Sequence, residues 1–449
     1  MGRLFGTDGV RGIANKDLSA EMATNMGVAL AMVLRERNPG KPKVVLGKDT
    51  RASSDMLESA LAAGLCAGGA DVELLGVVPT PAVAYLVTSR EAQAGVMISA
   101  SHNPYHFNGI KVFGPKGYKL SDDEEEEIEG ILLDHTPPYA YAPADQIGRV
   151  AWDGQAVHEY IRHIASTVKA DLSGLKVLVD CSNGSASATA RELFSALGVD
   201  AHIINDTPDG LNVNRHCGST HVEELCEKVT QGGYDLAVAF DGDADRCLAV
   251  DETGRVVNGD QMIAIFAVDM KAAGTLKNDT AVVTVMSNFG FFKFAQENGI
   301  HTRTTKVGDR YVLEAMLEEG HNIGGEQSGH IIFTDYMTTG DGQLSAVQLL
   351  SALGRSGKTL GQLAGVITIM PQVLINVEAD RDMKAAITES PELSQAIRRC
   401  EEQLGDRGRV LLRPSGTEPL IRVMVEGEDM EQIDAIAHTL ADAIKTYLP

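Results

Sequence analysis

The sequence predicts an α/β protein: three tandem related α/β domains with mixed sheets, then a smaller C-terminal α+β domain, around a central cleft. Three observations support this prediction. The chain has 449 residues, which corresponds to about three or four domains of ordinary size. An apolar strand followed by a small polar turn and a helix-like pattern occurs three times. The last stretch of about 80 residues instead contains alternating strands and a closing amphipathic helix.

The repeated segments are KVVLGKDT at 43–50, KVLVDCSNG at 176–184 and AVVTVMSNFG at 281–290. Their apolar stretches are nearly continuous rather than alternating, which is typical of parallel strands that are buried on both faces. Three tandem α/β domains explain the repetition most simply. Successive units of one large sheet would also produce it.

Changes in composition predict where the domains end. The stretch HTPPYAYAPADQIG at 135–148 has no helical or strand period, so it is predicted to be a linker. Further boundaries are expected near residue 253, in the turn after LAVDETG, and near residue 368, before MPQVLINVEAD. The predicted domains are therefore 1–150, 151–252, 253–368 and 369–449.

The acidic run SDDEEEEIEG at 121–130 is predicted to be a solvated helix start rather than an acidic binding tail. Ser121 is the expected N-cap, because its hydroxyl can accept from a free backbone N–H of the first turn. The carboxylates that follow are favoured there by the helix dipole. In the last domain, PLIRVMVEG is a predicted strand and EQIDAIAHTLADAIKTYL the closing helix.

Composition and charge disfavour a membrane or nucleic-acid partner. The chain is 44% hydrophobic and 22% charged, without the roughly 20 successive apolar residues of a membrane helix. The net charge of −23 disfavours a nucleic-acid surface. The polar opening MGRLFGTDGVRG and six cysteines without C-x-x-C spacing predict a cytoplasmic protein with reduced thiols and no structural zinc.

The first candidate site is the segment GVMISASHNP, which ends at Pro104. A predicted strand ends here, and ligand sites in parallel α/β sheets lie at the carboxyl ends of strands. Ser101 would be exposed to such a site, His102 adds a polar neighbour, and Pro104 keeps Asn103 out of the helical region. A nucleophile and an ordinary Ser/Asn/Pro turn fit these residues equally well.

The second candidate is the acidic loop DGDADR, which follows the apolar strand YDLAVAF. Asp241, Asp243 and Asp245 are separated by small residues and can converge on one hard divalent cation, which relieves their mutual repulsion. A calcium-binding EF-hand is the competing interpretation, since Glu252 stands at its twelfth position. It is disfavoured because Arg246 replaces the glycine at position six and because strands flank the loop.

The third candidate is GGEQSGH, a passage from strand to loop. Glu326 and Ser328 offer a carboxylate and a hydroxyl that suit the vicinal hydroxyls of a sugar. His330 can act as an acid or a base, although a single histidine at a loop end is more often structural.

The fourth candidate is RPSGTEP, with an arginine on the strand after it. Two guanidiniums, two hydroxyls and an accessible backbone amide would form a cradle for a phosphate dianion. The residues concerned are Arg413, Ser415, Gly416, Thr417 and Arg422. A nucleophile, a divalent metal, a polyol-binding loop and a phosphate cradle together are the parts needed for phosphoryl transfer on a sugar phosphate.

With these loops in view, the sequence resembles the α-D-phosphohexomutase superfamily along the whole chain. The resemblance is carried by FGTDGVRG, ASHNP, DGDADR, GEQSGH and RPSGTEP in that order. It implies that Ser101, rather than Ser99, carries the phosphoryl group, and that one Mg²⁺ per chain is bound by Ser101, Asp241, Asp243 and Asp245.

The resemblance also implies roles for further residues. Arg11, His102 and Lys111 would surround the phosphoserine, Arg246 would face it, and His330 or Lys111 would be the general base. The residues implied to bind the sugar phosphate are Arg246, Lys306, Gly308, Asp309, Arg310, Glu326, Ser328, Arg413, Ser415, Gly416, Thr417 and Arg422.

The implied reaction interconverts glucosamine 6-phosphate and glucosamine 1-phosphate, for amino-sugar nucleotide and cell-wall precursor synthesis. Glucosamine 1,6-bisphosphate would be its intermediate and activator. Gln327, together with the FGTDGVRG opening, favours the glucosamine branch, because the phosphoglucomutase and phosphomannomutase branches resemble GEMSGH at that loop. These branches are the first alternative. A non-catalytic phosphosugar-binding or Ca²⁺-binding sensor is the alternative from another class. The chain is expected to be a monomer or a homodimer.

Overall fold

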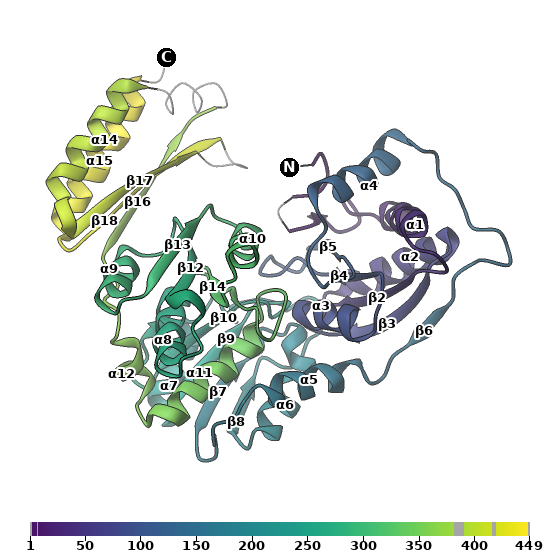
Figure 1. The fold of residues 1–449 in the computed structure, drawn as a ribbon, viewed down its shortest axis with the longest axis horizontal. Helices are drawn as coiled ribbons and strands as arrows, with labels where there is room; N and C mark the ends of the chain where they lie inside the picture. The colour runs from purple at the N-terminus through teal and green to yellow at the C-terminus, as the bar shows by residue number, and fades with distance from the viewer. Residues whose placement is uncertain (1, 7, 381–389, 415–418, 448–449) are drawn as a thin grey trace. The chain divides into compact units, whose positions relative to one another are not determined.

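The computed structural model of the chain describes residues 2–6, 8–380, 390–414 and 419–447 (Figure 1). The chain divides into two compact units. The first unit contains Met1–Met286 and Ile300–Val366, and the second contains Ser287–Gly299 and Ile367–Pro449.

The first unit contains three separate mixed sheets that repeat one strand order. In each sheet, three parallel strands are followed along the chain by an antiparallel one, and they lie in the order second, first, third, fourth. The repeated orders are β3-β2-β4-β5, β8-β7-β9-β10 and β13-β12-β14-β15. The prediction of three related α/β domains with mixed sheets is confirmed, and the alternative of one large sheet is wrong.

The first sheet has six strands, in the order β1-β5-β4-β2-β3-β6. Its strands are β1 Val10–Ile13, β2 Lys43–Lys48, β3 Asp71–Val77, β4 Ala94–Ile98, β5 Phe107–Phe113 and β6 Val150–Trp152. The helices of this part are α1 Ala20–Arg37, α2 Ala52–Gly68, α3 Thr80–Ser89 and α4 Asp122–Asp134. No helix or strand occupies 135–148, as predicted for the linker.

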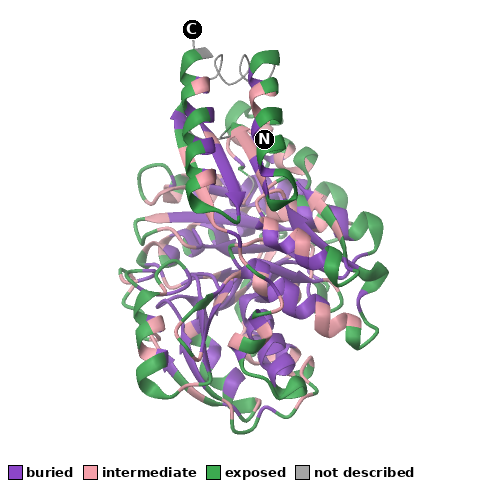
Figure 2. Cartoon of the chain, turned by 90° about the vertical axis from the view of Figure 1, so that its left-hand side faces the viewer, coloured by how far each residue is buried: buried purple, intermediate pink, exposed green. Residues whose placement is uncertain are grey.

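Both faces of the first sheet are covered, which explains the continuous apolar strands. Val44 and Leu46 pack in a core with α1 and α2. Gly47 and Gly95 instead lie against Val83 of α3, where an added Cβ would come within 3 Å of its methyl groups. Successive residues of a strand point to opposite faces, so α3 covers the face opposite α1 and α2. Figure 2 shows the buried strands and the exposed outer sides of the helices.

The second and third sheets follow the same plan. The second has the order β11-β10-β9-β7-β8 and the third β13-β12-β14-β15. Strands of the second sheet are β7 Lys176–Asp180, β8 Asp200–Ile204, β9 Leu236–Phe240, β10 Cys247–Asp251 and β11 Val256–Val257, and its helices are η1 Ser185–Ala188, α5 Ala156–Ser166, α6 Ala190–Ala196 and α7 Glu223–Gly232. Strands of the third are β12 Thr280–Thr284, β13 His301–Thr305, β14 Ile323–Gly325 and β15 Ile331–Phe333, with α8 Gly259–Ala272, η2 Lys277–Asp279, α10 Asp309–Glu319, α11 Gly342–Ser356 and α12 Leu360–Ala364.

The second unit is a three-stranded antiparallel sheet with helices on it, as predicted for an α+β domain. Its strands lie in the order β16-β18-β17. The elements are α9 Phe289–Glu297, β16 Gln372–Glu378, α14 Pro391–Leu404, η3 Gly405–Arg407, β17 Gly408–Pro414, β18 Leu420–Gly427 and α15 Met430–Tyr447. The buried carboxylate of Glu426 on β18 accepts from Asn288 Nδ2 and from the backbone N–H of Phe289, and so ties the start of α9 to this unit.

Local signals in the sequence mark several of these ends correctly. Ser121 caps α4 and forms a capping box with Glu124, because each side chain binds the other residue's backbone N–H. The six cysteines are free thiols. In the part of the chain that the structure describes, every helix is too short or too polar to span a bilayer.

Candidate active site

Three of the predicted site loops occupy the same turn of the repeated sheet. Each joins the third parallel strand to the antiparallel strand that follows it. ASHNP lies between β4 and β5, DGDADR between β9 and β10, and GEQSGH between β14 and β15. The repeated topology therefore presents one polar turn from each sheet, and hydrogen bonds join these turns in the first unit.

Ser101 points at the acidic loop of the second sheet. Its side chain is buried, and Oγ donates a hydrogen bond to Asp241 Oδ2 at 2.6 Å. Its φ of +51° lies in the left-handed region, which costs a non-glycine residue about 1–3 kcal/mol. Residues held in such conformations cluster at functional sites. A plain turn would not explain why the Ser101 hydroxyl is buried and points at a carboxylate, so the structure favours the nucleophile interpretation of ASHNP.

Gly242 allows the acidic loop to approach Ser101 closely. A Cβ on Gly242 would lie 2.5 Å from the carbonyl oxygen of Ser101 and 2.9 Å from Asn214 Nδ2. Any larger residue would push the two loops apart. The glycine in DGDADR thus has a packing reason that its spacing in the sequence does not reveal.

Asp241, Asp243 and Asp245 converge as the metal hypothesis requires. One oxygen of each lies within 4.8 Å of the others, and all three residues are buried. Among the described residues, Asp243 Oδ1 and Asp245 Oδ1 have no hydrogen-bond partner. Burial, together with the charges of Asp245 and Asp243, raises the pKa of Asp241 to about 8. A buried set of three converging carboxylates, two of whose oxygens have no hydrogen-bond partner among the described residues, fits a hard divalent cation such as Mg²⁺.

The strands that flank this loop exclude an EF-hand. The loop turns between β9 and β10, which pair antiparallel from Phe240 and Cys247 onward. An EF-hand loop would join two helices. DGDADR is therefore the turn of a β-hairpin, and its three carboxylates can bind a metal ion.

Lys111 lies on β5 and reaches this cluster from the first sheet. Its buried ammonium is 2.8 Å from Asp243 Oδ2, 3.4 Å from Asp245 Oδ2 and 2.9 Å from Asp8 Oδ2. Burial opposes the charge, but Asp243, Asp8 and Asp245 outweigh it and raise the pKa of Lys111. Lys111 is therefore a permanent cation at the centre of the site.

The histidine next to Ser101 faces Arg246 of the acidic loop. His102 Nδ1 lies 3.3 Å from Ser101 Oγ and 3.0 Å from Arg246 Nη1. Burial and the positive charge of Arg246 lower the pKa of His102 to about 4, so its imidazole is neutral. Arg11 on β1 pairs with Asp8. Within the described residues, the Nε atoms of Arg11 and Arg246 are buried without a hydrogen-bond partner.

His330 links the acidic loop to the third sheet. Its Nδ1 is 3.8 Å from Asp245 Oδ2, and its Nε2 is 3.6 Å from Asp309 Oδ2. Burial opposes the charged form, but Asp245 and Asp309 outweigh it and raise the pKa of His330. The structure thus places two carboxylates beside a residue that the sequence analysis offered as an acid or base.

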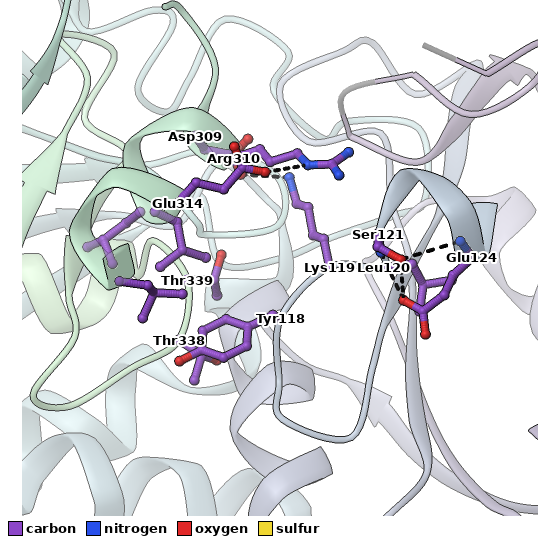
Figure 3. Close-up of a pocket in the computed structure, with 13 residues that line it drawn as sticks. Tyr118, Lys119, Leu120, Ser121, Glu124, Asp309, Arg310, Glu314, Thr338 and Thr339 are labelled. Carbon is purple, nitrogen blue, oxygen red and sulfur yellow. Dashed lines mark hydrogen bonds and ion pairs between the residues drawn. The ribbon is translucent and has the colours of Figure 1, made fainter. Parts of the chain in front are cut away.

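Lys119 is a site residue that the sequence analysis missed. Its ammonium lies 2.7 Å from Asp8 Oδ1 and 2.6 Å from Asp309 Oδ2. Figure 3 shows the side chain extending from the loop before α4 to the start of α10, beside a cavity of about 290 Å³. Acidic and basic side chains thereby alternate in a closed ring of Asp245, His330, Asp309, Lys119, Asp8 and Lys111.

We predict that Lys119→Met lowers the free energy of unfolding of the chain by about 3 kcal/mol, because it leaves two facing carboxylates without their shared cation. Urea unfolding followed by circular dichroism measures this change. Lys277→Met is the control, because Lys277 pairs with Asp335 at 2.6 Å on the surface of the same unit. The control should lose less than about 1 kcal/mol. Equal losses in the two variants would contradict a partly buried, stabilising bridge at Lys119.

The loop GEQSGH is held against the start of α10. Glu326 Oε1 accepts from the backbone N–H of Gly308 at 3.0 Å. Ser328 and Lys306 are exposed, and Lys306 Nζ lies 5.9 Å from the centre of the Tyr311 ring. The predicted residues of GEQSGH and TKVGDR are therefore neighbours within the first unit.

Arg310 differs from the other predicted binding residues because its guanidinium has protein partners away from the metal cluster. It donates to Glu314 on the next turn of α10, at 3.1 Å (Figure 3). It also donates to Asp122 of α4. In this structure Arg310 connects α10, a helix beside the third sheet, to α4, a helix beside the first sheet, rather than lying at the acidic loop.

In the second unit, Arg413 and Arg422 lie directly opposite each other on β17 and β18. Asn376 of β16 is the partner of Arg422 on its other side. The neighbouring Val423 belongs to the core, so the arginines lie on the face away from it. Two guanidiniums at facing positions can bind one anion together. The predicted residues Ser415, Gly416 and Thr417 lie outside the described residues.

Two further residues escaped the sequence analysis. Asp8 lies within the FGTDGVRG opening, and Thr80 Oγ1 donates to Asp243 Oδ2 at 2.6 Å. For Asp8, the sequence offered one signal of a functional role, a carboxylate beside glycines. For Thr80 it offered only a helix start after a strand. Their partners are far away along the chain, so local spacing does not indicate them.

Four domain families described as Phosphoglucomutase/phosphomannomutase match the chain. They are alpha/beta/alpha domain I at residues 2–137, domain II at 158–254, domain III at 258–369 and the C-terminal domain at 374–443.

Curated relatives match the whole chain. Phosphoglucosamine mutase of Acetivibrio thermocellus is 51% identical over 448 residues and that of Caldicellulosiruptor saccharolyticus 52% over 453, each covering 100% of both chains. A phosphoglucomutase/phosphomannomutase family protein from Burkholderia thailandensis shares the fold with a TM-score of 0.85 at 24% identity, over 99% of this chain and 98% of that one. Aspergillus fumigatus N-acetylphosphoglucosamine mutase, solved with GlcNAc-6P and magnesium, has a TM-score of 0.70 at 18% identity, over 99% and 96%.

Proposed function

The chain belongs to the phosphoglucomutase/phosphomannomutase family, and on that premise we propose that it is a phosphoglucosamine mutase. It interconverts glucosamine 6-phosphate and glucosamine 1-phosphate. The single observation that carries the proposal is the hydrogen bond from Ser101 Oγ to Asp241 Oδ2 at 2.6 Å, which places a hydroxyl nucleophile on a buried carboxylate cluster. The glucosamine substrate is supported by full-length relatives of about 50% identity that carry this name.

Asp241, Asp243, Asp245 and Ser101 are the residues that would hold one Mg²⁺. When bound, the ion offsets negative charge on the transferring phosphoryl group. The protein supplies the rest of the positive field. Lys111 stays charged beside Asp243, and the unpartnered Nε–H groups of Arg11 and Arg246 offer donors for phosphoryl oxygens.

The reaction runs in two phosphoryl transfers. In the first, the bond between phosphorus and Ser101 Oγ breaks as the free hydroxyl oxygen of the sugar phosphate bonds to phosphorus, which forms glucosamine 1,6-bisphosphate. The bisphosphate then reverses in the site. In the second transfer, Ser101 Oγ takes the other phosphoryl group and the sugar monophosphate leaves. The bisphosphate also serves as the activator, because it can phosphorylate a free Ser101.

We assign the general base to His330 rather than Lys111. The raised pKa of Lys111 keeps it as an ammonium without a lone pair, so it cannot accept the hydroxyl proton. The imidazole of His330 can accept it. Asp245 and Asp309, at 3.8 and 3.6 Å, then stabilise the imidazolium that forms.

Two further groups would bind the parts of the substrate that do not react. Glu326 and Ser328 would contact sugar hydroxyls, close to Lys306, Gly308 and Asp309. The pair of Arg413 and Arg422 would hold the remote phosphate through charge-assisted hydrogen bonds.

We predict that Arg413→Ala lowers kcat/KM for glucosamine 6-phosphate by about one to two powers of ten, since a hydrogen bond to a charged group contributes roughly 1.5–3 kcal/mol. More bisphosphate should also escape during turnover. Steady-state kinetics and quantification of free bisphosphate measure the two effects. Arg398→Ala, on the exposed side of α14, is the matched control and should behave like the parent. If Arg413→Ala equals the parent, the distal phosphate assignment is wrong.

A mutase assay with Mg²⁺ and a trace of bisphosphate tests the function. Glucosamine, glucose and mannose 6-phosphates are compared side by side, and kcat/KM should be highest for glucosamine 6-phosphate. Preference for another sugar would reassign the chain to the phosphoglucomutase or phosphomannomutase branch. No turnover of any sugar, together with an intact mass that phosphatase leaves unchanged, would favour a non-catalytic sensor.

The remaining expectations accompany this proposal. We place the reaction in the cytoplasm and keep 1–150, 151–252, 253–368 and 369–449 as the domain limits. Cell fractionation checks the compartment, and light scattering distinguishes a monomer from a homodimer.

A further inference from the structure

Arg51 is a buried arginine that binds the backbone of the Ser101 loop. It stands at the start of α2, in KVVLGKDTRASS, and has 2% of its surface exposed. A guanidinium carries five N–H donors, and here five acceptors receive them. They are Asp49 Oδ2 (2.7 Å), Ser101 O (2.8 Å), Asn103 O (2.8 Å), Pro104 O (2.6 Å) and Phe107 O (3.1 Å).

Four of these acceptors are backbone carbonyls: three belong to the loop between β4 and β5, and one to Phe107, the first residue of β5. Buried carbonyls require a partner, and one cation serves four of them. The carbonyl of Ser101 also accepts from Asn214 Nδ2 at 2.8 Å. Rotation of Ser101 from its φ of +51° into the right-handed region would turn this carbonyl away from both donors. Arg51 and Asn214 therefore stabilise the conformation in which Oγ points at Asp241.

Asp49 fixes the guanidinium and also holds the other side of Ser101. Its Oδ1 accepts from the backbone N–H of Arg51 at 3.0 Å and from Ser54 Oγ at 2.9 Å. Its Oδ2 accepts from Ser99 Oγ at 2.7 Å, and Ser99 Oγ in turn accepts from the Ser101 N–H at 2.9 Å. The pair of Asp49 and Arg51 thus secures both the amide and the carbonyl of Ser101.

The residues on either side of Arg51 form hydrogen bonds with loops that follow strands β7 and β8 of the second sheet. The same sheet carries the acidic loop. Thr50 Oγ1 donates to the carbonyl of Asn183 at 2.6 Å, and the N–H of Ala52 donates to the carbonyl of Gly210 at 3.0 Å. Arg51 and its two neighbours therefore bind both the Ser101 loop and the part of the chain that carries the acidic loop. The separation of these two parts sets the distance from Ser101 Oγ to the carboxylates.

We infer that Arg51 is a positioning residue for phosphoryl transfer: it holds the Ser101 loop in the left-handed conformation that directs Oγ into the carboxylate cluster. The inference rests on the proposed function. Arg51 itself contacts no reacting atom. A misplacement of the nucleophile by about 1 Å costs about 100-fold in rate, so loss of this clamp should lower kcat much more than it raises KM.

Arg51→Lys tests the inference, because lysine keeps the charge beside Asp49 but has three donors on one atom and cannot serve all five acceptors. We expect kcat per phosphorylated, folded molecule to fall about 10- to 100-fold, with KM for glucosamine 6-phosphate within about threefold of the parent. Intact mass gives the phosphorylated fraction, and urea unfolding the folded fraction. Arg90→Lys is the control, since Arg90 pairs with Glu73, Asp153 and Glu159 in the same unit. It should leave kcat unchanged.

Asn214→Ala is the second variant, and it serves alone if Arg51→Lys does not fold. It removes the other donor to the Ser101 carbonyl, so it should also lower kcat more than it raises KM. In the double variant the two effects should not add, because both act on one carbonyl. Full additivity, or a loss of kcat no greater than that of Arg90→Lys, would overturn the inference. The activity of the parent enzyme is measured before any variant is compared. An inactive parent would refute the proposed function rather than the role of Arg51.

Discussion

Ser101→Ala is expected to lower mutase turnover by about 1,000-fold or more, while the chain stays folded. The side chain that accepts and returns the phosphoryl group is gone, so no covalent carrier remains. The lost hydrogen bond to Asp241 removes one contact between two sheets that other bonds still join, including those of Lys111 and Thr80. Steady-state assays and unfolding curves measure the two properties separately.

The matched control is Ser99→Ala, two residues away on the same loop. Ser99 Oγ connects Asp49 to the backbone N–H of Ser101, so its removal loosens the loop without removing the carrier. We expect a loss of turnover below about tenfold. Phosphate should be found on the parent and on Ser99→Ala by intact mass, but not on Ser101→Ala. Near-normal turnover by Ser101→Ala would remove the nucleophile assignment.

Removal of the metal is expected to abolish activity reversibly. The three carboxylates gather buried negative charge, and two of their oxygens have no partner among the described residues. Asp243→Asn should raise the Mg²⁺ concentration needed for half-maximal activity by about tenfold or more, because a neutral amide replaces an anionic oxygen ligand. Titration of Mg²⁺ into chelator-treated enzyme measures this requirement.

Asp235→Asn is the control for the metal titration. Asp235 is exposed just before β9, and its carboxylate accepts from the Lys176 backbone N–H at 2.8 Å. Its Mg²⁺ requirement should equal that of the parent. Full activity in excess chelator, or an unchanged Mg²⁺ requirement in Asp243→Asn, would show that the carboxylates do not hold the essential ion.

Local patterns in the sequence were sufficient for the secondary structure around the site and for the identity of its loops. Continuous apolar strands predicted β2, β7 and β12 because such strands are buried on both faces. Ser121 predicted the start of α4, since a cap acts within one turn. The acidic triplet predicted a metal site because its residues are two apart on one turn.

The sequence by itself thus determined the elements, the loops and the types of chemical group, all of which depend on residues within one turn or strand. Only the tertiary structure decided which groups meet. Lys119 and Asp309 are 190 residues apart, Lys111 and Asp243 are 132 apart, and Ser101 and Asp241 are 140 apart. The roles of Asp8, Lys119 and Arg51 follow from such contacts. The repeated strand order brings these residues together, and hydrogen bonds and ion pairs depend on distance in space, which spacing along the chain does not specify.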